Sequence, residues 1–170
     1  PRTADPHRAS RGEVVPRALS LRRARDGAEA IAKDRRRYNP FHLVVGDGAE
    51  TYWVSWEHAA PLRLPPGLHV LTNMGLDTQE PKTLRIRRQV AGLGPGIPSI
   101  GALHTLLASH EAEGVPLELV APEVRRLGQA AHNLDALCVH LPHRGDGEIY
   151  GTRSSLVLLP GGPQEGYQLH

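Results

Sequence analysis

Residues 41–56 read FHLVVGDGAETYWVSW, and this stretch has the pattern of a β-hairpin. A short apolar run over 41–45 is followed by Gly46-Asp47-Gly48 and then by a second run, 51–56, rich in strand-forming residues. Two such runs around a glycine-containing turn predict a pair of antiparallel strands. Because the first run is apolar on both faces, we expect a layer of structure on each side of this strand.

Helices are expected before the hairpin. Ser10-Arg11-Gly12-Glu13 has the form of a capping box, which predicts that a helix begins there. Pro16 lacks the amide donor that a helix interior needs, so we expect a kink or a restart before Leu19. Small and apolar residues at helical spacing then continue to about Arg37.

The segments after the hairpin predict a mixture of loops, helices and strands. The expected elements are a loop over 61–67, strands over 68–71, 134–141 and 150–159, and helices over 81–90 and from Ser99 onwards. Gly145-Asp146-Gly147 would form the turn of a closing hairpin. This order predicts a single α+β domain over residues 1–170, with largely antiparallel sheets. The expected core residues are Phe41, Leu43, Val45, Val139 and Leu158.

Charge and composition narrow the class of protein. The chain has 20 basic and 18 acidic residues, a net charge of +2 that is too small to indicate a nucleic-acid partner. The arginines of the first 37 residues are interleaved with acids, which is typical of a solvated helix face. No apolar run approaches the roughly 18 residues that a membrane span needs. The one cysteine, Cys138, agrees with a reducing compartment, so we expect a cytoplasmic protein. Arginine strongly outnumbers lysine, which suggests a GC-rich bacterial genome.

The sequence predicts neither a metal nor a cofactor. Its ten histidines form no HExxH or HxH pattern, and the single cysteine rules out a CxxC pair. Cys138 is followed by Val139 and not by proline, so the chain has no Cys-Pro haem-contact motif. Because Cys138 lies within an apolar run, we expect it to pack in the core and not to act as a nucleophile.

Two polar clusters remain, and each has two interpretations. Asn73 and Asp77 follow the predicted strand over 68–71, where they could form a turn with an Asx hydrogen bond or part of a site. Residues 151–155 read GTRSS and stand at the start of an apolar run. Their hydroxyls and guanidinium could bond to neighbouring backbone, or they could face a ligand.

Four stretches of the chain resemble one known family. They are SRGEVV over 10–15, YNPFHLVVGD over 38–47, LPPGLHVLTN over 64–73 and YGTRSS over 150–155. They occur in the same order in the NRDE proteins, also called the transport and Golgi organisation family, which look like N-terminal-nucleophile hydrolases in fold. The resemblance implies an αββα sandwich.

The resemblance also has a gap. The chain contains neither the Asn-Arg-Asp-Glu segment that names the family nor the cysteine at position two that resembles the nucleophile of these hydrolases. We therefore expect a partial domain whose sheet lacks its N-terminal strands. The missing segment of its own domain would then be one of its partners, because open sheet edges favour pairing.

Roles for the polar clusters follow from the resemblance. It implies that Arg153 pairs a substrate carboxylate or steadies negative charge, and that Asn73 donates to an oxyanion. Thr152, Ser154, Ser155 and Asp77 would contact the substrate. The implied activity is cleavage of an amide or thioester by the complete domain. The alternative is a non-catalytic binding or trafficking protein for haem or for a lipid or acyl compound. In either case the partner is a small molecule.

Overall fold

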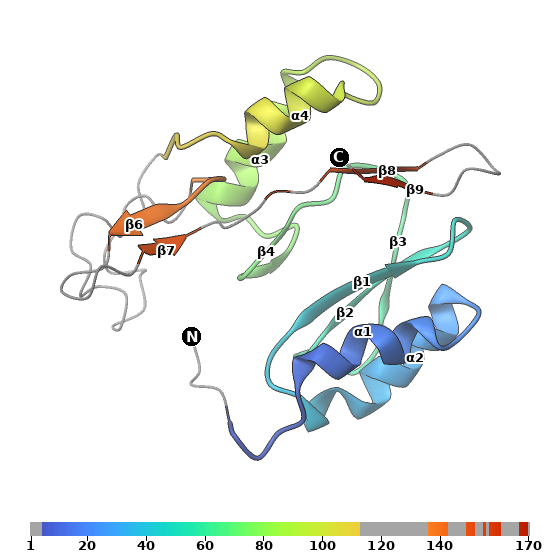
Figure 1. Cartoon of the computed structure of the whole chain (residues 1–170). Coiled ribbons are helices and arrows are strands. Elements are labelled where there is room, and N and C mark those ends of the chain that lie inside the picture. Colours follow the sequence, from blue (N-terminus) through green and yellow to red (C-terminus); the bar gives the residue numbers. More distant parts are fainter. Residues whose placement is uncertain are drawn as a thin grey trace. The chain divides into compact units, whose positions relative to one another are not determined.

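The computed structural model describes residues 5–112, 136–142, 149–151, 155, 157–160 and 167–169 (Figure 1). The chain divides into two compact units, Pro1–His69 and Val70–His170. Helices occur together with sheets whose named strands all pair antiparallel, which confirms the predicted α+β class. Among the described residues, no helix has the length and apolar character needed to cross a membrane.

The first unit begins with two helical pieces, as the sequence predicted. Ser10 caps a 3₁₀-helix, Arg11–Glu13, by accepting a hydrogen bond from the amide of Gly12 at 3.1 Å. Helix α1, Val14–Leu19, follows directly, so Pro16 stands in its first turn, where no amide donor is required. We had expected the break before Leu19, but it comes after this residue.

Helix α2, Ala24–Asp34, packs closely on α1 and continues into a 3₁₀-helix, Arg35–Arg37. A Cβ atom on Gly27 would lie only 2.6 Å from the carbonyl oxygen of Ala18. The two helices can approach this closely because Gly27 has no side chain. Alanines and one isoleucine cover the rest of the contact face of α2.

Strands β1, His42–Gly46, β2, Thr51–Ser55, and β3, Leu62–Leu64, form an antiparallel sheet in that order. The pairing of β1 with β2 confirms the predicted hairpin. Cross-strand partners Leu43 and Val54 share one face, and α2 packs against these two strands (Figure 1). The resulting core contains Val14, Ala18, Ala24, Ala28, Ile31, Ala32, Tyr38, Val45, Tyr52 and Val54.

One expectation for this sheet was wrong. The third strand is Leu62–Leu64, inside the segment predicted as a loop, and residues 68–70 are not in a strand. Pro61 stands just before this strand, where its missing donor leaves the ladder intact. On the other face of β1, Val44 is 47% exposed, and the second layer expected there stays a prediction.

The β1–β2 turn also holds the start of α2. One carboxylate oxygen of Asp47 accepts from the amide of Ala24 at 2.8 Å, and the other accepts from the turn amides of Ala49 and Glu50 at 3.0 Å each. These three donors lower the pKa of Asp47, the Ala24 amide contributing most. Asp47 thus caps α2 from a distant turn, because no side chain of its own helix does so.

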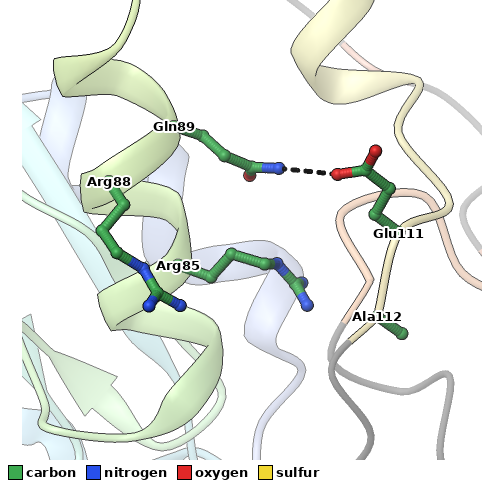
Figure 2. A pocket seen from close by; sticks show the side chains of 5 residues that line it. All are labelled: Arg85, Arg88, Gln89, Glu111 and Ala112. Atoms are coloured by element: carbon green, nitrogen blue, oxygen red, sulfur yellow. Dashed lines mark hydrogen bonds between the residues drawn. The ribbon is translucent and has the colours of Figure 1, made fainter.

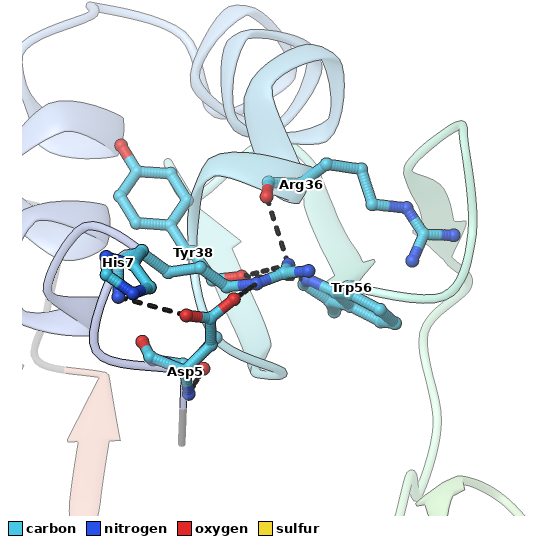
Figure 3. A network of polar contacts seen from close by, with 7 residues as sticks. Asp5, His7, Arg36, Tyr38 and Trp56 are labelled. Carbon is cyan, nitrogen blue, oxygen red and sulfur yellow. Dashed lines mark hydrogen bonds and ion pairs between the residues drawn. The ribbon is translucent and has the colours of Figure 1, made fainter. Parts of the chain in front are cut away.

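Residues near the end of the second helical piece anchor the beginning of the described chain, and Figure 3 shows Tyr38 and Arg36 beside Asp5 and Trp56. The Asn39 side chain accepts from the amide of Asp5 at 2.8 Å and donates to its carbonyl at 3.1 Å, so it imitates a paired strand. The Tyr38 carbonyl accepts from the indole of Trp56 at 2.9 Å. Arg36 lies over the Trp56 ring at 3.9 Å, a cation–π contact.

The second unit consists of short ribbons and two helices. They are β4, Leu71–Thr72, β5, Gly75–Leu76, α3, Pro81–Ala91, α4, Ile100–Leu107, β6, His140–Pro142, β7, Ile149–Gly151, β8, Leu158–Pro160, and β9, Tyr167–Leu169. Both predicted helices are confirmed, with Pro81 in the first turn of α3 and Ser99 accepting from the amide of Ala102 to cap α4.

The predicted closing strands are shorter than expected. β6 begins only at His140, because residues 136–138 bend to place the Cys138 amide on the carbonyl of Ser109 at 2.9 Å. The expected strand over 150–159 is divided between β7, which pairs with β6, and β8, which pairs with β9. Ser155 and Val157, between them, are in no strand.

The predicted core residues have three outcomes. Val45 and Val139 are buried, as expected. Phe41 and Leu43 are half-buried and pack against the core of the first unit. The side chain of Leu158 lies outside the described part of the structure.

Candidate functional site

The β4–β5 hairpin carries one of the two predicted polar clusters. Leu71 pairs with Leu76 and Thr72 with Gly75, which leaves Asn73 and Met74 as the turn. Asn73 is exposed, and its side-chain amide has no hydrogen-bond partner among the described residues. The hairpin therefore presents a free amide donor and acceptor at its tip.

Asp77 closes this hairpin. Its carboxylate accepts from the amide of Val70 at 2.8 Å, and its own amide donates to the Val70 carbonyl at 2.8 Å. Arg87 of α3 donates to the same carboxylate oxygen at 2.6 Å. Asp77 has a φ of 50°, a left-handed conformation that Asp adopts more readily than most residues. The carboxylate thus ties the base of the hairpin to α3.

A second set of polar contacts fixes the hairpin to the start of α3. The Thr72 hydroxyl donates to the carboxylate of Glu80, and Thr83 donates to the same oxygen at 3.3 Å. The Thr83 hydroxyl also lies 3.1 Å from that of Thr78. Because Thr83 is completely buried, these bonds satisfy a hydroxyl that would be costly to bury alone.

The other predicted cluster falls mostly outside what the structure describes. Thr152, Arg153 and Ser154 are among the residues without a description. Ser155 is described, and it is exposed. Asn73 and Asp77 are therefore brought together in one hairpin, whereas the approach of Arg153 to them stays a prediction. Among the described residues, Arg87 contacts Asp77.

A pocket of about 560 Å³ lies in the second unit (Figure 2). We call it the α3 pocket, and its lining residues are Arg85, Arg88, Gln89, Glu111 and Ala112. Three of them come from α3, and two from the segment that follows α4. Sequence reasoning missed this site, although the arginine-rich run over 85–88 was visible in the predicted helix.

The described residues offer no obvious place for a metal ion. In this part of the chain, no group of three or more His, Cys, Asp or Glu side chains could hold one. Cys138 was predicted to pack in the core, but it is only half-buried. What the described arrangement provides is hydrogen-bond donors near a fixed hairpin, a chemistry suited to holding an anionic or carbonyl oxygen.

Comparison with known proteins gives one finding. A family model described as Transport and Golgi organisation 2 matches residues 1–165 of the chain. The match covers almost the whole sequence. A comparison with curated proteins gives no match.

Proposed function

The chain belongs to the Transport and Golgi organisation 2 family, and on that premise we propose that it forms the substrate-contacting part of an amide- or thioester-cleaving hydrolase. The observation that supports this proposal best is the exposed amide of Asn73, which has no partner among the described residues. An amide fixed in a hairpin can donate to the oxyanion that forms when an acyl group is attacked.

The remaining residues of the two clusters have supporting roles in this proposal. Arg153 pairs a substrate carboxylate or steadies developing negative charge, and Thr152, Ser154 and Ser155 orient the substrate. Asp77 holds the hairpin in position through Val70 and Arg87. Contact between Asp77 and the substrate stays a prediction. On the grounds of its single cysteine and its arginine content, we place the protein in the bacterial cytoplasm.

A second candidate function is binding without catalysis, with haem or an acyl compound as the ligand. The engaged carboxylate of Asp77 favours it. Since that carboxylate accepts from both Val70 and Arg87, the hairpin presents a donor but offers no free general base. Such a site can hold a ligand oxygen without activating a nucleophile.

Turnover measurements separate the two candidates. The natural polypeptide that carries this sequence would be assayed on a short-chain acyl thioester and on the matching anilide, as wild type and as Asn73→Ala. We expect the alanine variant to lose about 10- to 1,000-fold in kcat, as when an oxyanion donor is removed. Since Asn73 is exposed, the melting temperature should not change.

Cys138→Ser is the matched control, and it should retain activity. An Asn73→Ala variant with wild-type kcat would refute the proposed role of Asn73. Saturable binding of haem or of a fatty-acyl probe, with no turnover of either substrate, would establish the binding function in place of the hydrolase.

A further inference from the structure

The α3 pocket carries charges of both signs on facing walls, and this pattern points to a ligand that does the same (Figure 2). We propose that it binds a small zwitterion, a molecule with a carboxylate and an amino group, such as a free amino acid. This inference does not depend on the proposed hydrolase activity, because it uses none of the residues assigned to it.

One wall is cationic. Arg85 and Arg88 come from α3, and the Arg85 side chain extends across the pocket towards the segment that contains Glu111. Arg85 is buried, at 5% exposure, whereas Arg88 is exposed. A guanidinium has five donors in a planar fork that matches a carboxylate, so it can bind a ligand in addition to the contacts it makes within the protein. This wall fits the carboxylate of the ligand.

The side of the pocket around Glu111 presents hydrogen-bond acceptors. Gln89 donates to the carboxylate of Glu111 at 3.5 Å, a long contact that leaves the remaining acceptor capacity of Glu111 available. The carbonyl oxygen of the Gln89 side chain is buried and has no hydrogen-bond partner among the described residues. A buried acceptor without a donor is costly, which indicates that a donor binds there. An ammonium group supplies three donors and a positive charge.

Charge and size favour a zwitterion over a simple anion. A ligand with only negative charge would gain from the arginines but would be repelled by Glu111, since like charges at short range repel strongly in a partly desolvated pocket. A ligand with only positive charge would gain from Glu111 but would be repelled by Arg85 and Arg88. The volume of about 560 Å³ lies within the range of ordinary small-molecule sites.

Three related probes test the proposal by calorimetric titration of the full chain. They are leucine, 4-methylpentanoate, which lacks the amino group, and 3-methylbutylamine, which lacks the carboxylate. We expect leucine to bind at least about tenfold more tightly than either analogue, the amount that one charge-assisted interaction provides. Equal affinity for leucine and 4-methylpentanoate, or no binding of any probe in the millimolar range, would overturn the proposal.

Two variants then test which residues bind the amino group of the ligand and which bind its carboxylate. Glu111→Gln should weaken leucine to the affinity of 4-methylpentanoate and leave the latter unimpaired. Arg88→Gln should weaken both carboxylates about tenfold and should not weaken the binding of 3-methylbutylamine. Arg88 is preferred to the buried Arg85 because its replacement should not impair folding. Arg25→Gln, at an exposed position of α2 in the first unit, is the charge-matched control. An equal loss of leucine affinity in this control would show that only net charge matters, which would contradict the proposal.

Discussion

The two units of the chain are stabilised by different means. In the first, α1, α2 and the three-stranded sheet enclose one apolar core, and side chains such as Asp47 and Asn39 bond to distant backbone. In the second, α4 has no buried residue, and the buried residues of α3 are the polar Thr83 and Arg85. The β4–β5 hairpin is held to α3 by the Asp77–Arg87 ion pair and to Glu80, just before α3, by the Thr72 hydroxyl.

This difference matters for function. In the first unit, the side chains of Asp47 and Asn39 are engaged in hydrogen bonds that hold the backbone. The described elements of the second unit instead keep amides, guanidinium groups and carboxylates near the surface, where ligands can reach them. Both candidate sites, the hairpin with Asn73 and the α3 pocket, lie in the second unit.

The largest effect is expected from the core of the first unit. Ile31 is completely buried between α2 and the sheet, so Ile31→Ala should cost about 2–5 kcal/mol of unfolding free energy. Leu84→Ala in α3, where the side chain is 40% exposed, should cost much less. Urea unfolding of both variants measures the contrast. Equal losses would mean that the two units do not differ in their dependence on apolar burial.

A smaller effect is expected from the glycines of the helices. Gly27→Ala would force α1 and α2 apart, because the new Cβ would lie 2.6 Å from a backbone oxygen of Ala18, and we expect a loss of about 1–3 kcal/mol. Gly101→Ala in α4 meets nothing within 4 Å and should stabilise by up to about 1 kcal/mol. Thermal unfolding checks both signs. Stabilisation by Gly27→Ala would disprove the close packing of the two helices.

The next effect tests the polar anchoring of the second unit. Asp77→Ala removes the bonds to Val70 and Arg87 and places alanine at a φ of 50°, so we expect a loss of about 1–2 kcal/mol. Asp77→Asn keeps an acceptor and tolerates this backbone conformation, so its loss should be about 0–1 kcal/mol. Chemical denaturation of both variants gives the comparison. If the two losses are the same, the anchor depends on the charge and not on the hydrogen bond to Val70.

The smallest effect is a dependence on pH in the first unit. The pKa of Asp47 is lower in the folded chain than its ordinary value of 3.8, because the amides of Ala24, Glu50 and Ala49 donate to its carboxylate. Its contribution to stability is therefore complete above that value and is lost as the pH falls through the folded pKa. Asp47→Asn should melt at a lower temperature than wild type at neutral pH.

This gap in melting temperature between wild type and Asp47→Asn should close as the pH falls below about 3.8. Melting curves recorded at decreasing pH measure it. A gap that stays constant into strong acid would show that the charge of Asp47 has no role in capping α2.

The sequence predicted those parts of the fold that local patterns specify. The β1–β2 hairpin and the Ser99 cap of α4 depend on neighbouring residues, and both were found. Strand β3 was missed because its proline-rich surroundings are typical of a loop, and its pairing with β2 is what makes it a strand. The bond between Asp47 and Ala24 spans 23 residues and leaves no periodic signature in the sequence.

The candidate sites, like the fold, could be predicted only where local patterns specify them. Asn73 and Asp77 could be identified because polar residues stand out after an apolar run. The contact of Arg87 with Asp77 could not, since arginines in a helix are usually solvated and their partners depend on tertiary packing. The α3 pocket was missed for the same reason, because Glu111 approaches α3 from a segment more than 20 residues away.

The side chain of Asn39 has a consequence for the chemical ageing of the protein. Asparagine deamidates when the backbone nitrogen of the next residue attacks its side-chain amide and forms a cyclic imide. The next residue here is Pro40, whose nitrogen carries no hydrogen and cannot complete that ring. The Asn39 side-chain amide, which bonds to the backbone of Asp5, is thus protected from this reaction. Asn39 should therefore deamidate more slowly than an asparagine followed by an ordinary residue, such as the exposed Asn73.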